Sequence, residues 1–396
     1  MRKTNQIHKL KGIGLAFLLF SPLVFAQTTP DAGALMRQTE QEFKQPFLPF
    51  AQPSRSLPVV SVPHSGEATL TVNRFQFAGN QRLSSAQLDH AVEPYLNRPL
   101  TFAQLQQAAD AVAAAYRESG WVVRAYLPKQ STHQGVVTIQ VTEAVYGKAF
   151  VLGTPALRMA SQRLLDMVAA AQKPGQAMSS RAIDRALLLM DDLPGVNVAG
   201  SMVEGENAGE TDVMLAISDE PLMTGSAGVD NHGSRSTGMG RLSGNFSFNS
   251  PMHLGDALAV NLLKTQGSDY QRLAYSLPMG LDGLRGGVQM SHMQYRLLGE
   301  FASLNGSGTA STGGVNVSYP LVRSQYENIN VALSYDAKTF DNVNSTGPQS
   351  NYKVNVVNAS FNLSELDNWA GGGANSASVA LTSGQVNLNG SANQSA

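Results

Sequence analysis

The side chains that could carry out acid–base or metal chemistry are scattered in this sequence. The seven histidines lack the i, i+4 pairing and the H-E-x-x-H pattern that hold zinc on a helix. No G-x-S-x-G nucleophile motif is present. Asp191 and Asp192 are adjacent and would point to different sides of a helix end, which favours capping and solvation over paired acid–base work. The sequence therefore predicts no enzyme active site.

Sequence motifs for cofactors and metals are also missing. Gly238-Met-Gly240 is half of a dinucleotide fingerprint, but it lies in a strand-rich stretch without a following helix. No Walker-type phosphate loop is found, and the absence of cysteine excludes disulfides and thiolate metal sites. The net charge of −1 argues against nucleic acid as a partner. We therefore predict no cofactor, no metal, no nucleotide and no nucleic acid.

The N-terminus has the three parts of a secretory signal peptide. A basic start is followed by an apolar run over residues 13–25 and by Val24-Phe25-Ala26. This pattern predicts cleavage after Ala26 and gives a signal peptide over residues 1–26. The run is too short to span a bilayer comfortably, which disfavours the alternative of a membrane anchor. No later segment is apolar for long enough to form a transmembrane helix.

Residues 27–68 are polar and rich in proline, as expected for a linker. Within them, residues 31–43 are compatible with one helix or with a disordered leader.

Two compact units of mixed helices and strands follow, and we predict that they occupy residues 69–145 and 146–220. The first begins with a strand at residues 70–77, where apolar and polar residues alternate. Thr101 with Gln104 forms a capping box at the start of a longer helix. Two further strands give the order β-α-α-β-β, and the second unit repeats this order.

From residue 221 to residue 396, short strands replace helices. Segments of about ten residues alternate apolar residues with Asn, Ser, Gly or Arg, which is the signature of transmembrane β-strands. Clear examples of the apolar set are Leu242, Phe246, Leu258, Val260, Leu262, Leu273, Tyr275, Val315, Val317 and Leu333. A strand that faces lipid must belong to a closed barrel, because its backbone groups have no water to bind. A soluble β-sandwich or a β-helical adhesin is the alternative.

About nine such strands can be counted, whereas single-chain bacterial barrels have even numbers of strands. Residues 390–396 are polar, although outer-membrane barrels commonly finish on an aromatic residue. We therefore expect a C-terminally incomplete chain that holds the N-terminal part of a barrel.

Several motifs in these units resemble those of one family. They are Phe75-Gln-Phe-Ala-Gly79-Asn80, Leu100-Thr-Phe-Ala-Gln-Leu105, Gly120-Trp121, Leu127-Pro-Lys-Gln130, Val137-Thr-Ile-Gln-Val-Thr-Glu143, Asp191-Asp192-Leu-Pro-Gly195-Val196, Gly228-Val-Asp230-Asn231 and Tyr319-Pro320-Leu321-Val-Arg323. From about residue 30 onward, the chain resembles the hemolysin secretion/activation proteins, which are two-partner secretion translocators. The family's Arg-Gly-Tyr loop has no counterpart here, because Arg285-Gly286-Gly287 lies in a different context.

The resemblance implies two periplasmic α/β POTRA domains (β-α-α-β-β) followed by a partial antiparallel transmembrane β-barrel in the outer membrane. Such a protein would export one large β-rich exoprotein of the hemolysin or adhesin type, which carries an N-terminal secretion domain. Outer-membrane lipid is the other implied partner. The helix at residues 31–43 resembles the family's plug helix, which occupies the barrel lumen at rest. A barrel-assembly insertase is the alternative function, and a porin or adhesin is a further one.

Partner capture by the POTRA pair fits β-augmentation, in which an extended segment adds to an open sheet edge. In the family, the second strand of each domain lies at that edge, which corresponds here to residues 121–127 and 196–203. The candidate substrate-binding residues are Leu105, Val112, Tyr116, Trp121, Val123, Tyr126, Val196 and Val198. Trp121 and Tyr126 would serve as aromatic anchors. Ordinary core packing is the alternative for each of the eight.

Overall fold

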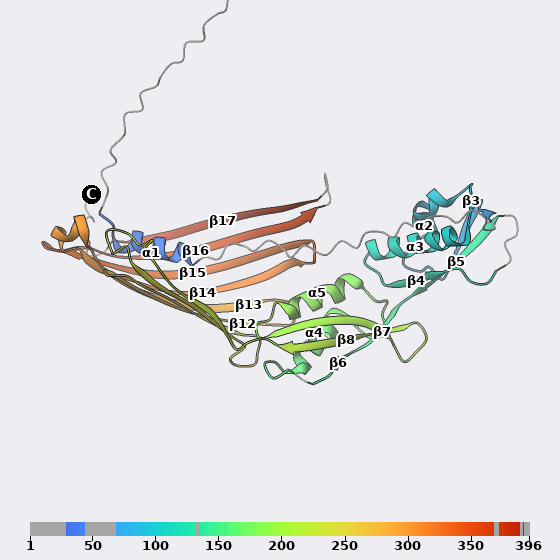
Figure 1. Cartoon of the computed structure of the whole chain (residues 1–396), viewed down its shortest axis with the longest axis horizontal. Helices are drawn as coiled ribbons and strands as arrows, with labels where there is room; N and C mark the ends of the chain where they lie inside the picture. The colour runs from blue at the N-terminus through green and yellow to red at the C-terminus, as the bar shows by residue number, and fades with distance from the viewer. Residues whose placement is uncertain are drawn as a thin grey trace, which may run out of the picture.

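The computed structural model describes residues 29–43, 69–130, 135–154, 156–367, 372–388 and 391. They form two α/β units and one long curved sheet, with the second unit between the first unit and the sheet (Figure 1). The predicted signal peptide and most of the predicted linker lie outside the described residues. Among the described residues, no helix is both long and apolar enough to cross a membrane.

The first α/β unit has a three-stranded sheet in the order β2-β5-β4. Strand β2 runs parallel to β5 and β4 runs antiparallel to it. The elements are β1 (Leu70–Thr71), β2 (Arg74–Ala78), α2 (Ser85–Val92), η1 (Glu93–Tyr95), β3 (Pro99–Leu100), α3 (Phe102–Glu118), β4 (Val123–Tyr126) and β5 (Val136–Glu143). Thr101 and Gln104 form the predicted capping box of α3. Gly120 follows the end of α3 with a φ of +85°, a left-handed conformation that favours glycine.

The second α/β unit repeats this architecture with the sheet order β6-β8-β7. Its elements are β6 (Val145–Leu152), α4 (Ser161–Ala171), α5 (Ser180–Asp191), β7 (Val196–Glu204) and β8 (Glu210–Asp219). The predicted order β-α-α-β-β is therefore confirmed in both units, while the exact domain limits stay predictions. Each unit has its own buried apolar core, formed where its two helices pack on one face of its sheet.

Main-chain hydrogen bonds join the two units. The N–H of Val122 donates to the carbonyl of Met178 at 3.1 Å, and the N–H of Met178 donates to the carbonyl of Ala144 at 2.8 Å. The N–H of Ala144 in turn donates to the carbonyl of Val122 at 3.0 Å. An isolated β-bridge between Trp121 and Ser179 lies beside them. The junction therefore has a defined geometry and is not a loose tether.

The large sheet is an antiparallel meander of nine strands in sequence order. Its strands are β9 (Met223–Asp230), β10 (Arg241–Asn249), β11 (Ala257–Lys264), β12 (Ser268–Pro278), β13 (Arg285–Arg296), β14 (Ser307–Arg323), β15 (Glu327–Asn344), β16 (Gly347–Asp367) and β17 (Gly373–Asn387), with η2 (Gly299–Leu304) between β13 and β14. Strands β9 and β17 lie at its two edges. Among the described residues the sheet is therefore open, as expected for part of a barrel.

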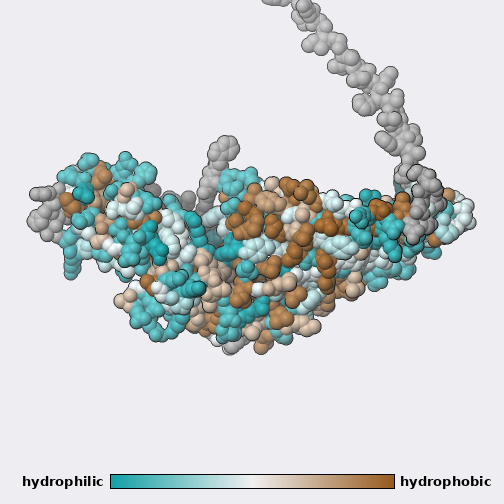
Figure 2. Space-filling model, turned by 180° about the vertical axis from the view of Figure 1, so that it is seen from behind, coloured by the Kyte–Doolittle hydropathy of each residue, from teal (hydrophilic) through white to brown (hydrophobic). Residues whose placement is uncertain are grey.

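The two faces of this sheet differ in chemistry, because successive side chains of a strand point to opposite faces. The convex face carries exposed apolar residues on most strands, such as Leu273, Met290, Val315 and Leu333. In the space-filling view, hydrophobic side chains gather over the large sheet (Figure 2). The concave face carries mainly polar residues and one helix, α1 (Ala32–Glu42). The helix expected at residues 31–43 is therefore present.

Strand β4 ends early for a reason that lies in its sequence. The β4–β5 register pairs Tyr126 with Gln140, so a longer β4 would set Pro128 opposite Thr138. Proline has no N–H to donate. The amide nitrogen of Gln130 donates to the carbonyl of Thr138 at 2.8 Å, and its Oε1 accepts from the N–H of Thr138 at 2.7 Å. These are the two bonds that a paired antiparallel residue would make.

Replacing Gln130 by alanine should expose the Thr138 peptide group and destabilise the first unit by about 1–2 kcal/mol, because two hydrogen bonds are lost. We expect amide hydrogen exchange at Thr138 to become faster in the whole protein. Lys129→Ala is the matched control, since the Lys129 side chain is exposed and neither bond depends on it. Unchanged protection at Thr138 in the alanine variant would contradict this role of Gln130.

Candidate functional site

Helix α1 lies within the curve of the large sheet (Figure 1). Asp31 caps its N-terminus by accepting a hydrogen bond from the N–H of Ala34. One face of the helix is apolar and packs on side chains that β11 to β15 and the loop after β13 turn inward. The buried residues of this contact, which we call the helix seat, are Ala32, Leu35, Met36, Leu263, Tyr270, Met293, Tyr295, Leu297, Ala310 and Phe340.

Charged and polar groups fix α1 at both ends. The N–H of Ala32 donates to Asn342 Oδ1 at 2.9 Å. Near the C-terminal end, Lys338 Nζ lies 3.0 Å from Glu40 Oε2, and Arg241 Nη1 lies 2.6 Å from Glu42 Oε2. Both cationic side chains are less than one-fifth exposed. Ion pairs removed from water in this way are less screened by salt than surface pairs.

A row of hydrogen-bonded side chains crosses the concave face next to the helix seat. Asn261 Nδ2 donates to Asn245 Oδ1 at 2.9 Å, and Arg272 donates to Asn261 Oδ1 at 3.1 Å. Arg272 also donates to Gln289 Oε1 at 2.6 Å, and Gln289 Nε2 donates to Asp336 Oδ1 at 2.9 Å. We call these five residues the polar row. It links β10, β11, β12, β13 and β15 and balances the charge of Arg272 with that of Asp336.

The polar row passes over β14 at a glycine. Gly314 lies between Gln289 and Asp336 in the strand register, and a methyl group there would overlap the Asp336 carboxylate. The missing side chain therefore lets Asp336 reach across one strand to Gln289.

Gly314→Ala should break the Gln289–Asp336 bond and lower the thermal stability of the sheet, at a cost of about 1–3 kcal/mol for a charged acceptor that loses its partner. Gly313→Ala is the matched control, because that neighbouring glycine faces open space on the convex side. The heat-dependent shift in gel mobility of the full-length protein measures this stability. Equal midpoints for the two variants would count against the polar row as a stabilising contact.

The predicted strand edges are present in both α/β units. Strand β4 pairs only with β5, and β7 pairs only with β8, in the part of the chain that the structure describes. The eight predicted substrate-binding residues divide into two groups. Leu105, Val112, Tyr116, Val196 and Val198 are buried in the two cores. Trp121 and Val123 are half-buried beside β4, and Tyr126 is 42% exposed.

Two of these side chains have specific partners. The Tyr116 hydroxyl donates to Glu143 Oε1 at 2.8 Å, and burial, together with this carboxylate, raises the pKa of Tyr116 above its usual range. The Trp121 ring lies under the Arg82 guanidinium at 4.8 Å and lines a cavity of about 710 Å³ between the two units. Their roles as partner contacts stay predictions.

The β7 edge offers main-chain donors. The N–H of Val198 donates to Asp191 Oδ1 at 3.3 Å and therefore points away from β8. Because alternate residues of a strand turn their peptide groups to the same side, the N–H groups of Gly200 and Met202 also point away from β8. Met202 is 42% exposed. Nine residues of β7 thus form a longer edge than the four residues of β4.

The second unit is fixed to one end of the sheet. Arg163 donates to the carbonyl of Gly280 at 3.0 Å, and Arg185 donates to the carbonyl of Pro320 at 2.7 Å. Arg323 pairs with Asp192, with contacts of 2.7 and 2.8 Å. Asp191 and Asp192 therefore bind different groups. These contacts lie at strand ends opposite to the helix seat.

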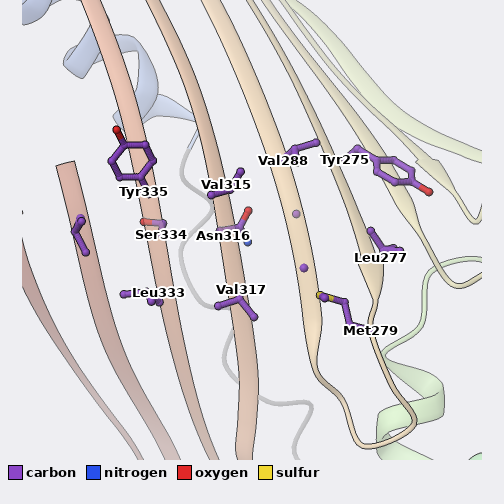
Figure 3. A pocket seen from close by; sticks show the side chains of 13 residues that line it. Tyr275, Leu277, Met279, Val288, Val315, Asn316, Val317, Leu333, Ser334 and Tyr335 are labelled. Carbon is purple, nitrogen blue, oxygen red and sulfur yellow. The ribbon is translucent and has the colours of Figure 1, made fainter. Parts of the chain in front are cut away.

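The convex face has a shallow depression of about 510 Å³ near that same end (Figure 3). Its lining includes Tyr275 and Leu277 of β12, Val288 of β13, Val315 and Val317 of β14, and Met279 just after β12, with further residues of β15 and β16. Its lining is apolar, which suits contact with hydrocarbon and offers little for polar chemistry. Among the described residues, no group of three or more His, Cys, Asp or Glu side chains is placed to hold a metal ion.

Two α/β units of this topology, followed by an antiparallel sheet with an apolar outer and a polar inner face, define the class of POTRA and β-barrel proteins of the outer membrane. Residues 70–144 match the family model of the POTRA domain, ShlB-type. Residues 209–395 match that of the haemolysin secretion/activation protein ShlB/FhaC/HecB. The chain belongs to this family, and its POTRA domains accordingly lie in the periplasm.

Known proteins similar to the chain are transporters. It is 24% identical over 365 residues to the heme/hemopexin transporter protein HuxB of Haemophilus influenzae, which covers 89% of this chain and 64% of the relative. It is 30% identical over 249 residues to the outer membrane transporter CdiB of Escherichia coli, which covers 61% of this chain and 42% of the relative. The chain thus spans less than two thirds of the length of these relatives.

Solved structures of similar fold include CdiB from Escherichia coli, with a TM-score of 0.62, 22% identity and coverage of 91% of this chain and 69% of that one. CdiB from Acinetobacter baumannii gives a TM-score of 0.54 at 16% identity and covers 89% of this chain and 69% of that one. The fold predicted from the sequence, two POTRA domains followed by part of a barrel, is therefore confirmed.

Proposed function

We propose that this protein is the outer-membrane translocator of a two-partner secretion system. It would recognise and export one large β-rich exoprotein of the haemolysin or adhesin type. The observation that carries the proposal is the seat of α1: a helix from the N-terminal segment packs on apolar side chains of the inner face of the sheet and is held by ion pairs with Lys338 and Arg241. A steadily open porin needs no such helix, whereas a translocator that opens only for its partner does.

The open POTRA edges would capture the exported partner. An extended segment of the exoprotein adds to a sheet edge through main-chain hydrogen bonds, and side chains beside the edge give specificity. Trp121, Val123 and Tyr126 would contact the segment at β4 directly. Leu105, Val112, Tyr116, Val196 and Val198 would support the two edges from the cores beneath them.

The remaining partners follow from the same proposal. Outer-membrane lipid would cover the apolar convex face, including the depression lined by Leu277 and Val315. The protein would act without catalysis, cofactor, nucleotide or nucleic acid. Transport would then draw its free energy from folding of the exoprotein outside the cell.

Secretion of the candidate exoprotein, compared in cells with and without this protein at full length, tests the proposal. We expect the exoprotein to reach the surface or the medium only when the translocator is present, and to stay periplasmic otherwise. Unchanged export together with failed assembly of other barrels would favour the insertase function. Unchanged export and unchanged assembly would overturn both.

A further inference from the structure

On strands β12 to β15, the convex face divides into an apolar part and a polar part. On β13, the outward side chains Val288 and Met290 are 54% and 62% exposed, and His292 and Gln294 follow them in the same outward row. On β15, Leu333 and Tyr335 precede Thr339 and Asp341. On β12, Leu273, Tyr275 and Leu277 follow Asp269 and Gln271. The apolar parts together form a belt, which is the surface that faces hydrocarbon in a barrel.

On β12 to β15 the helix seat lies beyond this belt, whereas on β11 the seat residue Leu263 lies at the edge of the belt, between Leu262 and Lys264. Met293 points inward between His292 and Gln294, and Phe340 points inward between Thr339 and Asp341. Tyr270 and Ala310 repeat the pattern: Tyr270 lies between Asp269 and Gln271, and Ala310 lies between Thr309 and Ser311. The wall that holds α1 therefore has a polar outer surface. Charged and amide groups on the lipid face are costly within the hydrocarbon layer.

Strand length agrees with this division. A tilted strand crosses the hydrocarbon layer in about 9–11 residues. Strands β14, β15 and β16 have 17, 18 and 21 residues. The extra residues lie mainly at the end that carries the helix seat. At the opposite end the strands stop where they meet the second POTRA domain, through Arg185 and Arg323.

We infer that α1 closes the protein on the extracellular side of the hydrocarbon layer, within a collar of sheet that stands out of the membrane. The POTRA contacts mark the periplasmic end, so the collar is extracellular. The inner wall that lies within the membrane is then the neighbouring part of the concave face, which carries the polar row. Two of its residues show this: Gln289 is flanked by Val288 and Met290 of the belt, and Asp336 follows Tyr335. This inference concerns depth and does not depend on the proposed export function.

Two single-cysteine variants on one strand test this depth, and the chain suits the test because it contains no cysteine. Met290→Cys and Gln294→Cys both face outward on β13, about 14 Å apart along the strand. On intact cells, a membrane-impermeant maleimide should label Gln294→Cys and leave Met290→Cys unlabelled. Once purified, labelled with a fluorophore and placed in vesicles, the Met290→Cys variant should be quenched by lipids spin-labelled on the acyl chain.

A third variant tests whether α1 itself is accessible from outside the cell. Gln38→Cys, on the exposed side of α1, should react with the same reagent from outside the cell. Normal heat-modifiable mobility on gels confirms that each variant has folded, whatever its secretion activity. If Gln294→Cys resists the impermeant reagent and is quenched by the acyl spin label as strongly as Met290→Cys, the seat lies within the hydrocarbon layer and the inference is wrong.

Discussion

Changing both Glu40 and Glu42 to lysine should release α1 from the helix seat and open the pore that α1 would close under the proposed function. The two lysines would face Lys338 and Arg241, which are both less than one-fifth exposed. Breaking a partly buried ion pair and replacing it with repulsion costs on the order of 2–3 kcal/mol at Lys338, and less at Arg241, which keeps its pair with Asp230. Together the two changes supply a large part of the ~5.5 kcal/mol that moves an equilibrium from 1:99 to 99:1.

Conductance of the full-length protein in planar bilayers measures this release, and uptake of a large antibiotic by cells reports the same event. Glu40→Lys combined with Lys338→Glu restores that ion pair in reverse and should recover part of the closed state. Glu40→Gln with Glu42→Gln is the milder control, which removes attraction without adding repulsion. A double lysine variant that conducts no more than the original protein would show that the apolar seat alone holds the helix.

Met202→Pro should abolish export if the partner pairs with β7. The Met202 N–H points away from β8, so proline removes a donor from the open edge and leaves the β7–β8 pairing in place. An incoming strand would lose that hydrogen bond and would clash with the proline ring. We therefore expect a loss of secretion with normal amounts of protein in the outer membrane.

The comparison with Met202→Ala separates backbone from side-chain effects, since alanine keeps the N–H and removes only the thioether side chain. Secretion close to normal in the alanine variant and lost in the proline variant supports strand addition. The corresponding change in the first unit is Ala125→Pro, because alternation along β4 turns the Ala125 peptide group away from β5. Full secretion in both proline variants would rule out capture at either edge.

Local features of this protein could be predicted from sequence, because they depend on neighbouring residues. The capping box of Thr101 and Gln104, the left-handed Gly120 and the alternating strands of the large sheet are all of this kind. The early end of β4 could have been predicted from Pro128, because proline removes a main-chain hydrogen-bond donor. The effect of that proline on strand pairing depends on the register with β5, which the sequence alone does not supply.

The candidate site was harder to predict for the same reason. Leu105, Val112 and Tyr116 form an apolar stripe on α3, and a stripe does not tell whether core or partner covers it. The contact of Glu40 with Lys338 joins residues 298 positions apart. A lysine on the polar face of a strand rich in Asn and Asp is a weak signal that can be recognised only once the fold is known. The same holds for Gly314, whose missing side chain matters only because Asp336 faces it.

The main-chain hydrogen bonds between Val122, Ala144 and Met178 have a consequence for how tightly a partner is held. Because they set the spacing of the β4 and β7 edges, the two edges would act as one bivalent receptor for the proposed exoprotein. A chain bound at one edge would present its next segment to the other at a high effective concentration, so two weak contacts would give a strong combined avidity. The spacing between matching segments in the exoprotein, more than the affinity of either segment alone, would then decide which proteins are accepted.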